Sequence, residues 1–450
     1  MPLHLLAPRT GRGLGLLVAA AVSLGLASAA AAGPATPVLD RNFPDPDIVK
    51  AAGAYHAYAT NDDGKHIQHA TSRDLVGWKV DSGNVLPVLG AWAKPEEGKV
   101  WAPEVYDNGG GFTMQYTARD RASDRQCIGV ALSSSPDGPF RPVGDGPLVC
   151  PAAQGGAIDA SSYTEGGQRY LLWKNDGNCC GMDTWLHLQP TSWDGTRTTG
   201  EPVRLIRQDP DPEREGRLVE APTLVKRDGR YVLFYSADDY RGEKYKTSYA
   251  VADRLTGPYT KAANPLMTTA TFSGAVRGPG GQDVVSGPDG RDYLFFHGWS
   301  DRGRMMYRAD LGFANGYPVV RGSKVRYQAE NARVHHAGVR AAPAAWDGHV
   351  VGGIDHADSY VEFAVFAASA GTHTLAVRFA NGSFDSAGTP VPADHGLTVN
   401  SARAGVMHYQ HTGWGKWAVV ETTVTLKAGW NTLRLSKGEY FAELDAVEVA

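Results

Sequence analysis

The strongest constraint on the fold is a repeat of about 60 residues. Five times along the chain an aromatic residue follows a Gly- or Asp-rich turn and opens a short hydrophobic strand; these residues are Tyr55, Phe112, Tyr170, Tyr231 and Tyr293. They are separated by 57, 58, 61 and 62 residues. Each repeat has room for four strands, divided by clusters of Asp, Gly and Pro that end a strand. The sequence therefore predicts an all-β, five-bladed β-propeller over residues 38–318.

A second register lies in the strand before each turn. Ten or eleven residues before the five aromatics stand Asp45, Trp101, Asp159, Glu220 and Gln282. Equivalent positions on the innermost strands of a closed propeller converge on its central channel, so three carboxylates would meet there. Each acid alone would more often be a turn residue or a satisfied buried acid. Their shared register favours a catalytic role.

Composition agrees with an all-β chain and excludes some partners. Glycine accounts for 54 of 450 residues and proline for 27, so turns are frequent. The net charge of −4 gives no basic excess. Nucleic acid and anionic membrane surfaces are therefore not expected partners.

The first 32 residues have the pattern of a secretory signal peptide. Arg9 and Arg12 precede an apolar run over 14–26, and an Ala-rich stretch ends at Gly33. A transmembrane anchor is the weaker interpretation, because the run is shorter than the ~20 residues that a span needs. We expect cleavage after Ala32 and a secreted, extracellular protein, which we take to be a monomer.

Export makes the four cysteines candidates for disulfides. Four cysteines allow three pairings. We favour Cys127 with Cys150 and a vicinal pair of Cys179 and Cys180. A metal site is the weaker alternative, because no second Cys-x-x-Cys or His-x-His partner lies at ligand spacing.

The rhythm of the chain changes after Pro318. From residue 325 onward apolar and polar residues alternate in segments such as 359–366, 373–382 and 431–438. A period of two without any helix-length pattern is typical of a β-sandwich. We therefore expect a separate sandwich (jelly-roll) domain over residues 325–450.

Four sequence strings carry a resemblance to a known family. The strings are FPDPDI (43–48), WAPEV (101–105), AIDASSY (157–163) and VEAPTLVKRDGRYVLFYS (219–236). They resemble glycoside hydrolase family 43, and the likeness extends over most of 38–318. The resemblance implies a five-bladed propeller that hydrolyses arabinosides and xylosides with inversion, without a cofactor for catalysis. By the same resemblance Asp45 matches the general base, Glu220 the general acid, and Asp159 the residue that orients the acid and tunes its pKa.

The chemistry of inversion agrees with these roles. One protonated carboxyl donates to the leaving oxygen, and a carboxylate about 6.5–9.5 Å away activates water on the opposite face of the sugar. Glu220 must hold its proton near neutral pH, which a negative charge on Asp159 and an apolar strand would favour. Asp45 must stay ionised.

Several further residues are expected to bind the sugar. Trp101 shares the register of the acids, and Trp92 lies just before it, although a core position for Trp92 is nearly as plausible. Phe43 and Arg277 are weaker candidates for the pocket.

Gln282 marks a departure from the family pattern. Many relatives carry Gly-Pro-Gly-His in the fifth blade, with a histidine that holds a central ion or water. This chain has Gly-Pro-Gly-Gly-Gln at 278–282, so a central ion is doubtful. Gln282 is instead a candidate to bind substrate. His297 is an alternative ligand for an ion, but a packed strand histidine is the more plausible interpretation.

The C-terminal domain resembles carbohydrate-binding module families 6 and 35. The resemblance rests on YQAENARV, VRFANG, TGWGKWAVVETTVTLKAGWNTLRL and AELDAVEV. It implies a structural calcium held by Gln328, Glu330 and Asp445, since calcium takes six to eight oxygen ligands. It also implies that Trp414 stacks on a sugar and that Asn381 binds its hydroxyls, with Trp417 in the core. The alternative is a calcium-braced sandwich that binds nothing.

We therefore expect a secreted hydrolase of arabinose-containing plant cell-wall polysaccharides or oligosaccharides, of the arabinofuranosidase or arabinanase type. A β-xylosidase is the first alternative, and a fructan-acting hydrolase a more distant one. A non-catalytic, sugar-binding propeller is the alternative from another class. The sugar, the linkage and the choice between exo and endo action depend on loops that the sequence does not define.

Overall fold

Strands make up almost all of the regular structure, so the all-β prediction is confirmed. The computed structural model describes residues 37–449 except 263, 273, 315, 322–324, 347 and 368–369. The predicted signal peptide, residues 1–32, lies outside the described residues. Within the described part of the chain, no helix has the length and apolar character needed to cross a membrane.

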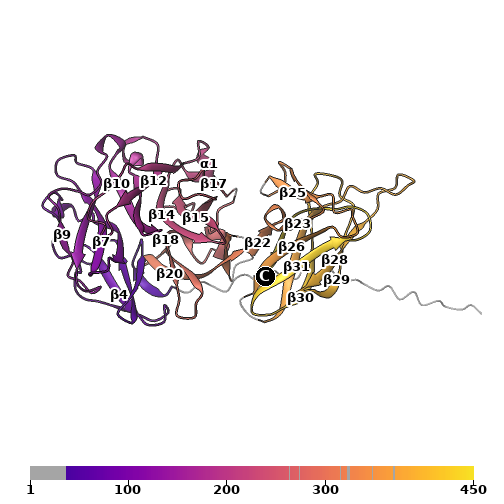
Figure 1. Cartoon of the computed structure of the whole chain (residues 1–450), viewed down its shortest axis with the longest axis horizontal. Helices are drawn as coiled ribbons and strands as arrows, with labels where there is room; N and C mark the ends of the chain where they lie inside the picture. Colours follow the sequence, from indigo (N-terminus) through magenta and orange to yellow (C-terminus); the bar gives the residue numbers. More distant parts are fainter. Residues whose placement is uncertain are drawn as a thin grey trace, which may run out of the picture.

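The chain up to residue 321 forms five antiparallel sheets (Figure 1). The first four have four strands each: β2 (Asp47–Ala51), β3 (Ala54–Ala59), β4 (Gln68–Ser72), β5 (Trp78–Val80); β6 (Trp101–Asp107), β7 (Phe112–Arg119), β8 (Gln126–Ser133), β9 (Arg141–Val143); β10 (Ala157–Glu165), β11 (Gln168–Asn175), β12 (Trp185–Thr191), β13 (Val203–Arg207); β14 (Val219–Arg227), β15 (Arg230–Ala237), β16 (Lys246–Ala252), β17 (Thr260–Lys261). The fifth contains β18 (Arg277–Ser286), β19 (Asp292–Ser300), β20 (Gly303–Ala314), β1 (Leu39–Asn42) and β21 (Tyr317–Arg321).

Both registers read from the sequence are present in these sheets. The five repeated aromatics lie in the second strand of each sheet, in β3, β7, β11, β15 and β19. The residues of the second register lie in or directly before the first strands, β2, β6, β10, β14 and β18. The strands form where predicted because β-branched and aromatic residues alternate between Gly- and Asp-rich turns.

The fifth sheet joins the two ends of this part of the chain. β1 pairs antiparallel with β20, and the N–H of Val38 donates to the carbonyl of Met306 at 2.9 Å. Arg304 donates its N–H to Oδ1 of Asn42 at 3.0 Å, across 262 positions of sequence. The fifth sheet is therefore completed by the first strand rather than by its own repeat.

The first strands of the five sheets are also linked to one another. Every junction between neighbouring first strands has a hydrogen bond between a backbone group of one strand and a side chain of the other. The pairs are Ile48 N–H to Asp283 (2.9 Å), Val105 N–H to Asp47 (2.8 Å), Ser162 N–H to Glu104 (2.9 Å), Ala221 N–H to Asp159 (2.9 Å) and Thr223 Oγ1 to the Gln282 carbonyl (2.8 Å). The sheets themselves pack through apolar clusters, such as Tyr58, Met114 and Phe140 between the first and second.

The connections contain short helical turns and two disulfides. The turns are η1 (Pro95–Glu97), η2 (Ala152–Gln154), η3 (Gly177–Cys180), α1 (Pro212–Glu215), η4 (Thr269–Phe272) and, later in the chain, η5 (Ala329–Asn331). Cys127 is bonded to Cys150, and Cys179 to Cys180, which confirms the favoured pairing.

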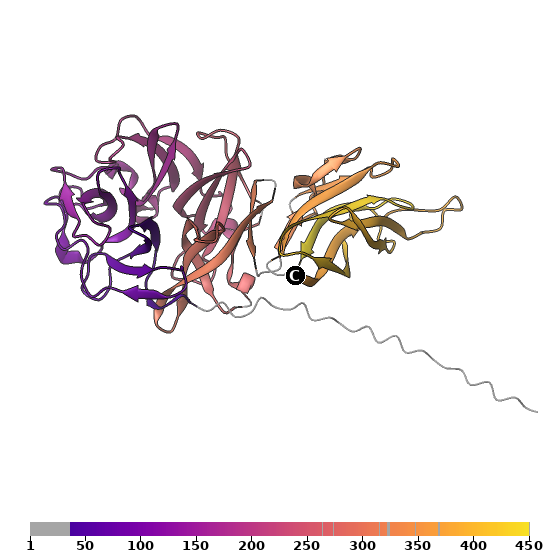
Figure 2. The ribbon, with the colours of Figure 1, turned by 60° about the horizontal axis from the view of Figure 1, so that its bottom comes forward.

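The chain from β22 onward forms two further sheets, seen as a second lobe in Figures 1 and 2. One contains β22 (Val325–Gln328), β24 (Gly338–Ala341), β25 (His349–Gly352), β27 (Gly371–Ala380), β30 (Ala418–Leu426) and β32 (Glu443–Val449). The other contains β23 (Arg333–His335), β26 (Tyr360–Ala367), β28 (Ala393–Val399), β29 (Ala402–Tyr409) and β31 (Gly429–Lys437). Their inward side chains share one core, with Phe363, Phe379 and Leu435 among its members.

Candidate active site

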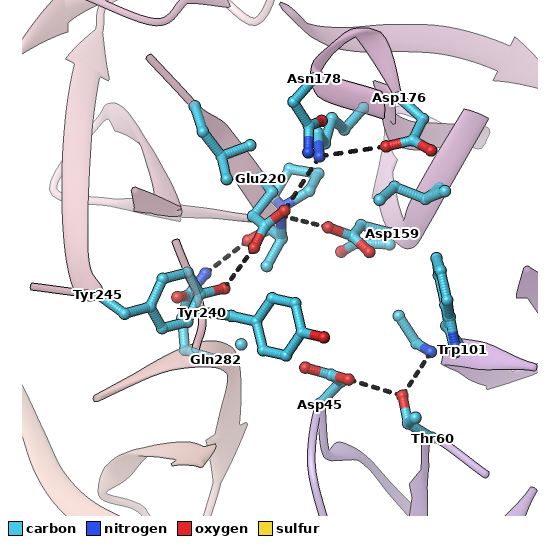
Figure 3. A pocket seen from close by; sticks show the side chains of 18 of the residues that line it. Asp45, Thr60, Trp101, Asp159, Asp176, Asn178, Glu220, Tyr240, Tyr245 and Gln282 are labelled. Carbon is cyan, nitrogen blue, oxygen red and sulfur yellow. Dashed lines mark hydrogen bonds and ion pairs between the residues drawn. The ribbon is translucent and has the colours of Figure 1, made fainter. Parts of the chain in front are cut away.

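A cavity of about 770 Å³ is lined by residues from all five sheets of the first lobe. Asp45, Asp159 and Glu220 all line it. Figure 3 shows their carboxyl groups turned toward one space, with Asp45 opposite Glu220. The three acids that share a sequence register are thus brought together in the structure.

A repeated backbone feature turns these side chains into the cavity. Each first strand, or the two residues before it, carries a residue in the left-handed region at or next to the second-register position; these are Asp45 (φ 54°), Ala102 (φ 40°), Asp159 (φ 58°), Ala221 (φ 50°) and Gly281 (φ 60°), and β18 has a further one at Gly278 (φ 59°). In β6, β10, β14 and β18 this residue lies where the pairing with the second strand shifts register. A β-bulge of this kind re-aims a side chain, and residues other than glycine pay a steric cost for it.

Asp45 is held by three polar neighbours. Thr60 donates its hydroxyl to Oδ2 at 2.6 Å, and Nη1 of Arg304 lies 3.3 Å from Oδ1. Nδ1 of His297 accepts the N–H of Asp45 at 3.2 Å. Burial acts to raise the pKa of Asp45, but Arg304, His297 and Thr60 together lower it below its ordinary value. This carboxyl is therefore ionised at neutral pH.

Glu220 is held by a different set of groups. Nζ of Lys174 lies 3.0 Å from Oε2, and Tyr245 donates its hydroxyl to Oε1 at 2.8 Å. The Lys174 side chain is fully buried, and Glu220 is 8% exposed. Burial opposes the charge on Lys174, but the carboxylates of Glu220, Asp176 and Asp159 raise its pKa. The lysine is therefore a permanent cation beside Glu220.

The third of these acids, Asp159, has a raised pKa. Its Oδ2 accepts the N–H of Ala221 at 2.9 Å. Burial, and next the charge of Glu220, raise the pKa of Asp159 to about 8. We expected a charged Asp159 to keep the proton on Glu220. In the structure Asp159 is itself an acid of the cavity with a raised pKa, and its predicted role of orienting Glu220 and tuning its pKa stays a prediction. Lys174 supplies a cation that we did not predict.

The predicted sugar-binding residues divide into two groups. Trp101 and Gln282 line the cavity, and the amide of Gln282 is held by Ser236 and the Ala221 carbonyl. The prediction for Trp92 is wrong, because its ring is buried and stacks on a core tyrosine.

The predictions that Phe43 and Arg277 line the pocket are also wrong. Phe43 is fully buried in the core between the first and fifth sheets. Arg277 lies outside the cavity lining, where its guanidinium faces Glu243 and Asp301 at the surface. An aromatic ring beside a catalytic motif fits a core as well as it fits a pocket, and sequence alone does not separate the two.

Sequence reasoning missed several residues that contact the acids, namely Thr60, Lys174, Tyr245 and Arg304. Lys174 had a usable signal, because it follows the apolar run Leu171–Trp173 in the second strand of its sheet. A charged residue in such a strand is costly unless a partner neutralises it. The other three had no signal in one sequence.

A second group of acids lies in the cavity wall. Asp47, Glu104 and Asp283 line the cavity, and each accepts a backbone N–H from the neighbouring first strand. Burial, and next the charge of Glu104, raise the pKa of Asp283 to about 8. Burial is also the main cause that raises the pKa values of Asp47 and Glu104. These acids join sheets together and are not all ionised at neutral pH.

The second lobe corrects one predicted sugar contact. Asn381 is fully buried, and its amide donates to the carbonyls of Val391 and Tyr409 and accepts from the N–H of Ser383. It therefore has no group left for a ligand. Trp414 is 51% exposed and lies over the backbone of Gly382.

The predicted calcium site fits only in part. β22 and β32 lie side by side, and Oε1 of Gln328 is buried without a hydrogen-bond partner among the described residues. The carboxylate of Asp445, however, accepts from the guanidinium of Arg378 and from the N–H of Trp346. In this structure Arg378 and Trp346 thus engage the carboxylate of Asp445, and its predicted role as a calcium ligand stays a prediction. The roles of Gln328 and Glu330 stay predictions.

A family profile covers the first lobe. The profile of the glycosyl hydrolases family 43 matches residues 34–312. Extracellular endo-α-(1→5)-L-arabinanase 1 of Bacillus subtilis is 26% identical over 293 residues, which cover 61% of this chain and 86% of the relative. Extracellular exo-α-(1→5)-L-arabinofuranosidase of Streptomyces chartreusis is 30% identical over 273 residues, covering 58% and 80%. The crystal structure of a thermostable family-43 glycoside hydrolase superposes with a TM-score of 0.57 at 28% identity, covering 64% of this chain and 95% of that one.

Proposed function

The chain belongs to glycosyl hydrolase family 43 and is a glycosidase of O-glycosyl bonds, and from this premise we propose that it cleaves arabinose-containing plant cell-wall polysaccharides or oligosaccharides with inversion. The two relatives described above, an endo-arabinanase and an exo-arabinofuranosidase, support the choice of sugar. A β-xylosidase of the same family is the alternative activity.

Asp45 is the general base in this proposal. Inversion needs an ionised carboxylate on the side of the sugar from which water attacks. Arg304 and Thr60 hold Asp45 in that state, and its left-handed backbone directs it into the cavity. Asp45 takes a proton from water as the water oxygen bonds to the anomeric carbon.

Glu220 is the general acid. It donates a proton to the glycosidic oxygen as the bond to the anomeric carbon breaks, and it becomes a carboxylate. The cation of Lys174 and the hydroxyl of Tyr245 stabilise that carboxylate where it forms. Both groups therefore favour proton transfer in the transition state.

Asp159 acts on the protonation of the proposed general acid. Burial and the charge of Glu220 raise the pKa of Asp159, so the pair of Asp159 and Glu220 includes a protonated acid at neutral pH. Glu220 is the member of the pair opposite Asp45 across the cavity (Figure 3). Asp159 is thus a positioning residue that keeps a proton available for Glu220.

One observation carries the proposal: the two sides of the cavity differ in protonation. Asp45 is held as a carboxylate by Arg304, whereas the pKa of Asp159, beside Glu220 on the other side, is raised. The test is hydrolysis of linear arabinan, 4-nitrophenyl α-L-arabinofuranoside and 4-nitrophenyl β-D-xyloside. Asp45→Asn and Glu220→Gln should each lower the rate at least about a hundredfold with the fold intact. Glu243→Gln, a surface acid outside the cavity lining, is the matched control.

The products separate the remaining alternatives. Proton NMR of the first-formed sugar should show the inverted anomer, and retention would reject Asp45 as a base. Activity on the xyloside alone would make the enzyme a β-xylosidase. Arabinan that binds without being cut would favour the sugar-binding alternative.

We also propose that the five sheets close into a five-bladed propeller. Two observations support closure: the hydrogen bonds that link β18 to β2 as they link the other first strands, and the pairing of β1 with β20. Structural neighbours of this family support the same architecture.

We propose a sugar-binding role for the second lobe, as a jelly-roll module separate from the enzyme domain. Three exposed aromatics support it: Phe384, Trp414 and Phe441 are about half exposed. Ser383 exchanges hydrogen bonds with Phe441, which brings the segments of Phe384 and Phe441 together. Exposed aromatic rings in one region mark a binding surface. Export by the segment 1–32 also stays a proposal, which the two disulfides support.

A further inference from the structure

Two buried histidines lie on one face of the first sheet, away from the cavity lining. His69 in β4 pairs with Tyr58 in β3, so His56, two residues from Tyr58, shares its face. His56 is 4% exposed and His69 is fully buried. Nδ1 of His56 lies 3.1 Å from Nε2 of His69.

A carboxylate approaches each histidine. Oδ2 of Asp81 lies 2.6 Å from Nδ1 of His69, and Oδ1 of Asp137 lies 3.4 Å from Nδ1 of His56. Asp137 belongs to the turn between β8 and β9 of the second sheet. That turn is fixed to the first sheet by the hydroxyl of Tyr58, which donates to the carbonyl of Pro136 at 2.5 Å. The cluster therefore spans two sheets.

We propose that His56 Nδ1, His69 Nε2 and the Asp137 carboxylate bind a divalent transition metal of the zinc class, with water as a fourth ligand. The three ligand atoms lie within 4.8 Å of one another. Zinc ligands stand about 2.0–2.2 Å from the metal, so two of them at a tetrahedral angle are about 3.3 Å apart. The separations of 3.1 and 3.4 Å match the edges of such a tetrahedron.

The protonation of the cluster suits a metal. Asp81 accepts the Nδ1 proton of His69, which leaves the Nε2 lone pair directed at the site. A carboxylate behind a histidine ligand is the usual outer partner of zinc sites.

The donor set narrows the choice of metal. Two imidazole nitrogens and one carboxylate favour zinc, copper or nickel over calcium or magnesium. In the absence of metal, the proton of His56 Nδ1 bridges the two rings. Binding of the metal moves that proton to Nε2 of the same neutral imidazole, which leaves the Nδ1 lone pair for the metal. The alternative to the proposal is a chain of hydrogen bonds from Asp81 through both histidines to Asp137. Since none of the four residues lines the cavity, the metal would brace the first sheet against the second rather than take part in hydrolysis.

The test is zinc binding by the tag-free full chain after dialysis against EDTA. We expect one equivalent of Zn²⁺ by calorimetry, a raised melting temperature, and the visible absorption of a tetrahedral site with Co²⁺. Asp137→Asn should weaken binding about tenfold or more. Its side chain is 61% exposed, so the variant should fold, whereas His69→Ala opens a hole in the core.

The chain contains its own control for adventitious binding. His335, His336 and Asp358 form an exposed cluster of the same composition in the second lobe. The double variant His335→Ala/His336→Ala should keep the zinc stoichiometry and affinity. Zinc that binds to Asp137→Asn as tightly as to the parent chain, or that is lost with His335 and His336, would overturn the proposal. So would the absence of any zinc binding to the full chain.

Discussion

Nζ of Lys174 lies 3.0 Å from Oε2 of Glu220, and the lysine side chain has no contact with solvent. A buried cation of this kind persists only where carboxylates neutralise it, and removal of one partner of such a pair is costly. The pair therefore ties the proposed acid to the second strand of the neighbouring sheet. It also sets the charge that Glu220 meets when it loses a proton.

Lys174→Met should lower the hydrolysis rate by a factor of about a hundred or more, the usual effect of losing one preorganised charge. Lys174 lowers the pKa of Asp159, so without the cation that pKa rises and the alkaline limb of the pH–rate profile should move to higher pH. Lys226→Met is the matched control, because Lys226 pairs with Glu165 at 2.8 Å on the surface. An unshifted alkaline limb in a folded Lys174 variant would contradict the assignment.

Arg304→Met should change the opposite limb of the profile. Arg304 lowers the pKa of Asp45, so its removal raises that pKa. The base then becomes protonated at higher pH, and the acid limb of the kcat/KM profile should move to higher pH. Rates between pH 4 and 8 would measure this, and a shift to lower pH would reject Asp45 as the group that titrates.

The buried acids of the cavity wall should make stability fall as pH rises. The pKa of Asp283 is raised to about 8 in the folded chain, against about 3.9 when unfolded, so the folded state binds more protons between these values. Its contribution is present below pH 4 and lost as pH rises through about 8. We expect Asp283→Asn to reduce the fall in melting temperature from pH 5 to pH 8 by several degrees. Asp253→Asn, at an exposed turn, should leave the fall as it is in the parent chain.

The two disulfides should contribute unequally to stability. Cys127 and Cys150 are 23 positions apart, and closing a loop of that size stabilises a fold by about 3 kcal/mol in the chain-entropy model. Cys179 and Cys180 are adjacent, so their bond closes no loop of chain. Denaturant unfolding of Cys127→Ala/Cys150→Ala should therefore show the larger loss. Equal losses in Cys179→Ser/Cys180→Ser would contradict this entropic account.

Trp414→Ala should weaken binding of the full chain to insoluble arabinan without changing hydrolysis of a soluble aryl glycoside. Loss of one stacking ring costs about 0.5–1.5 kcal/mol in comparable aromatic contacts, or a factor of about 2–13 in affinity. Trp193→Ala is the matched control, since Trp193 is equally exposed on the first lobe. Unchanged retention on the polysaccharide would reject Trp414 as part of the binding surface.

Periodicity predicted the strands of the first lobe because each strand is specified locally, by its own turns and its own alternation. The same register brought Asp45, Asp159 and Glu220 to one cavity. The neighbours of these acids were not predictable in this way. Tyr245 and Arg304 reach the cavity from strand ends and turns, and their contacts depend on how the sheets pack.

The errors have physical reasons as well. Trp92 and Asn381 have side chains that suit a sugar, yet both are used by the protein itself, in ring stacking and in three hydrogen bonds. The carboxylate of Asp445 also has a partner within the protein, the guanidinium of Arg378. Residue type indicates what a side chain is able to do, and packing decides whether it is free to do it.

The pairing of β1 with β20 has a consequence for the order in which the molecule is built. The first strand leaves the ribosome some 262 positions before its partner. Its backbone hydrogen-bonding groups lack that partner until β20 has been synthesised. Contacts at such sequence separation form late, because the chain must first bring distant segments together. The N-terminal strand β1 is therefore the last strand of the first lobe to be incorporated. A nascent or truncated chain that lacks β20 leaves the edge of β1 unpaired.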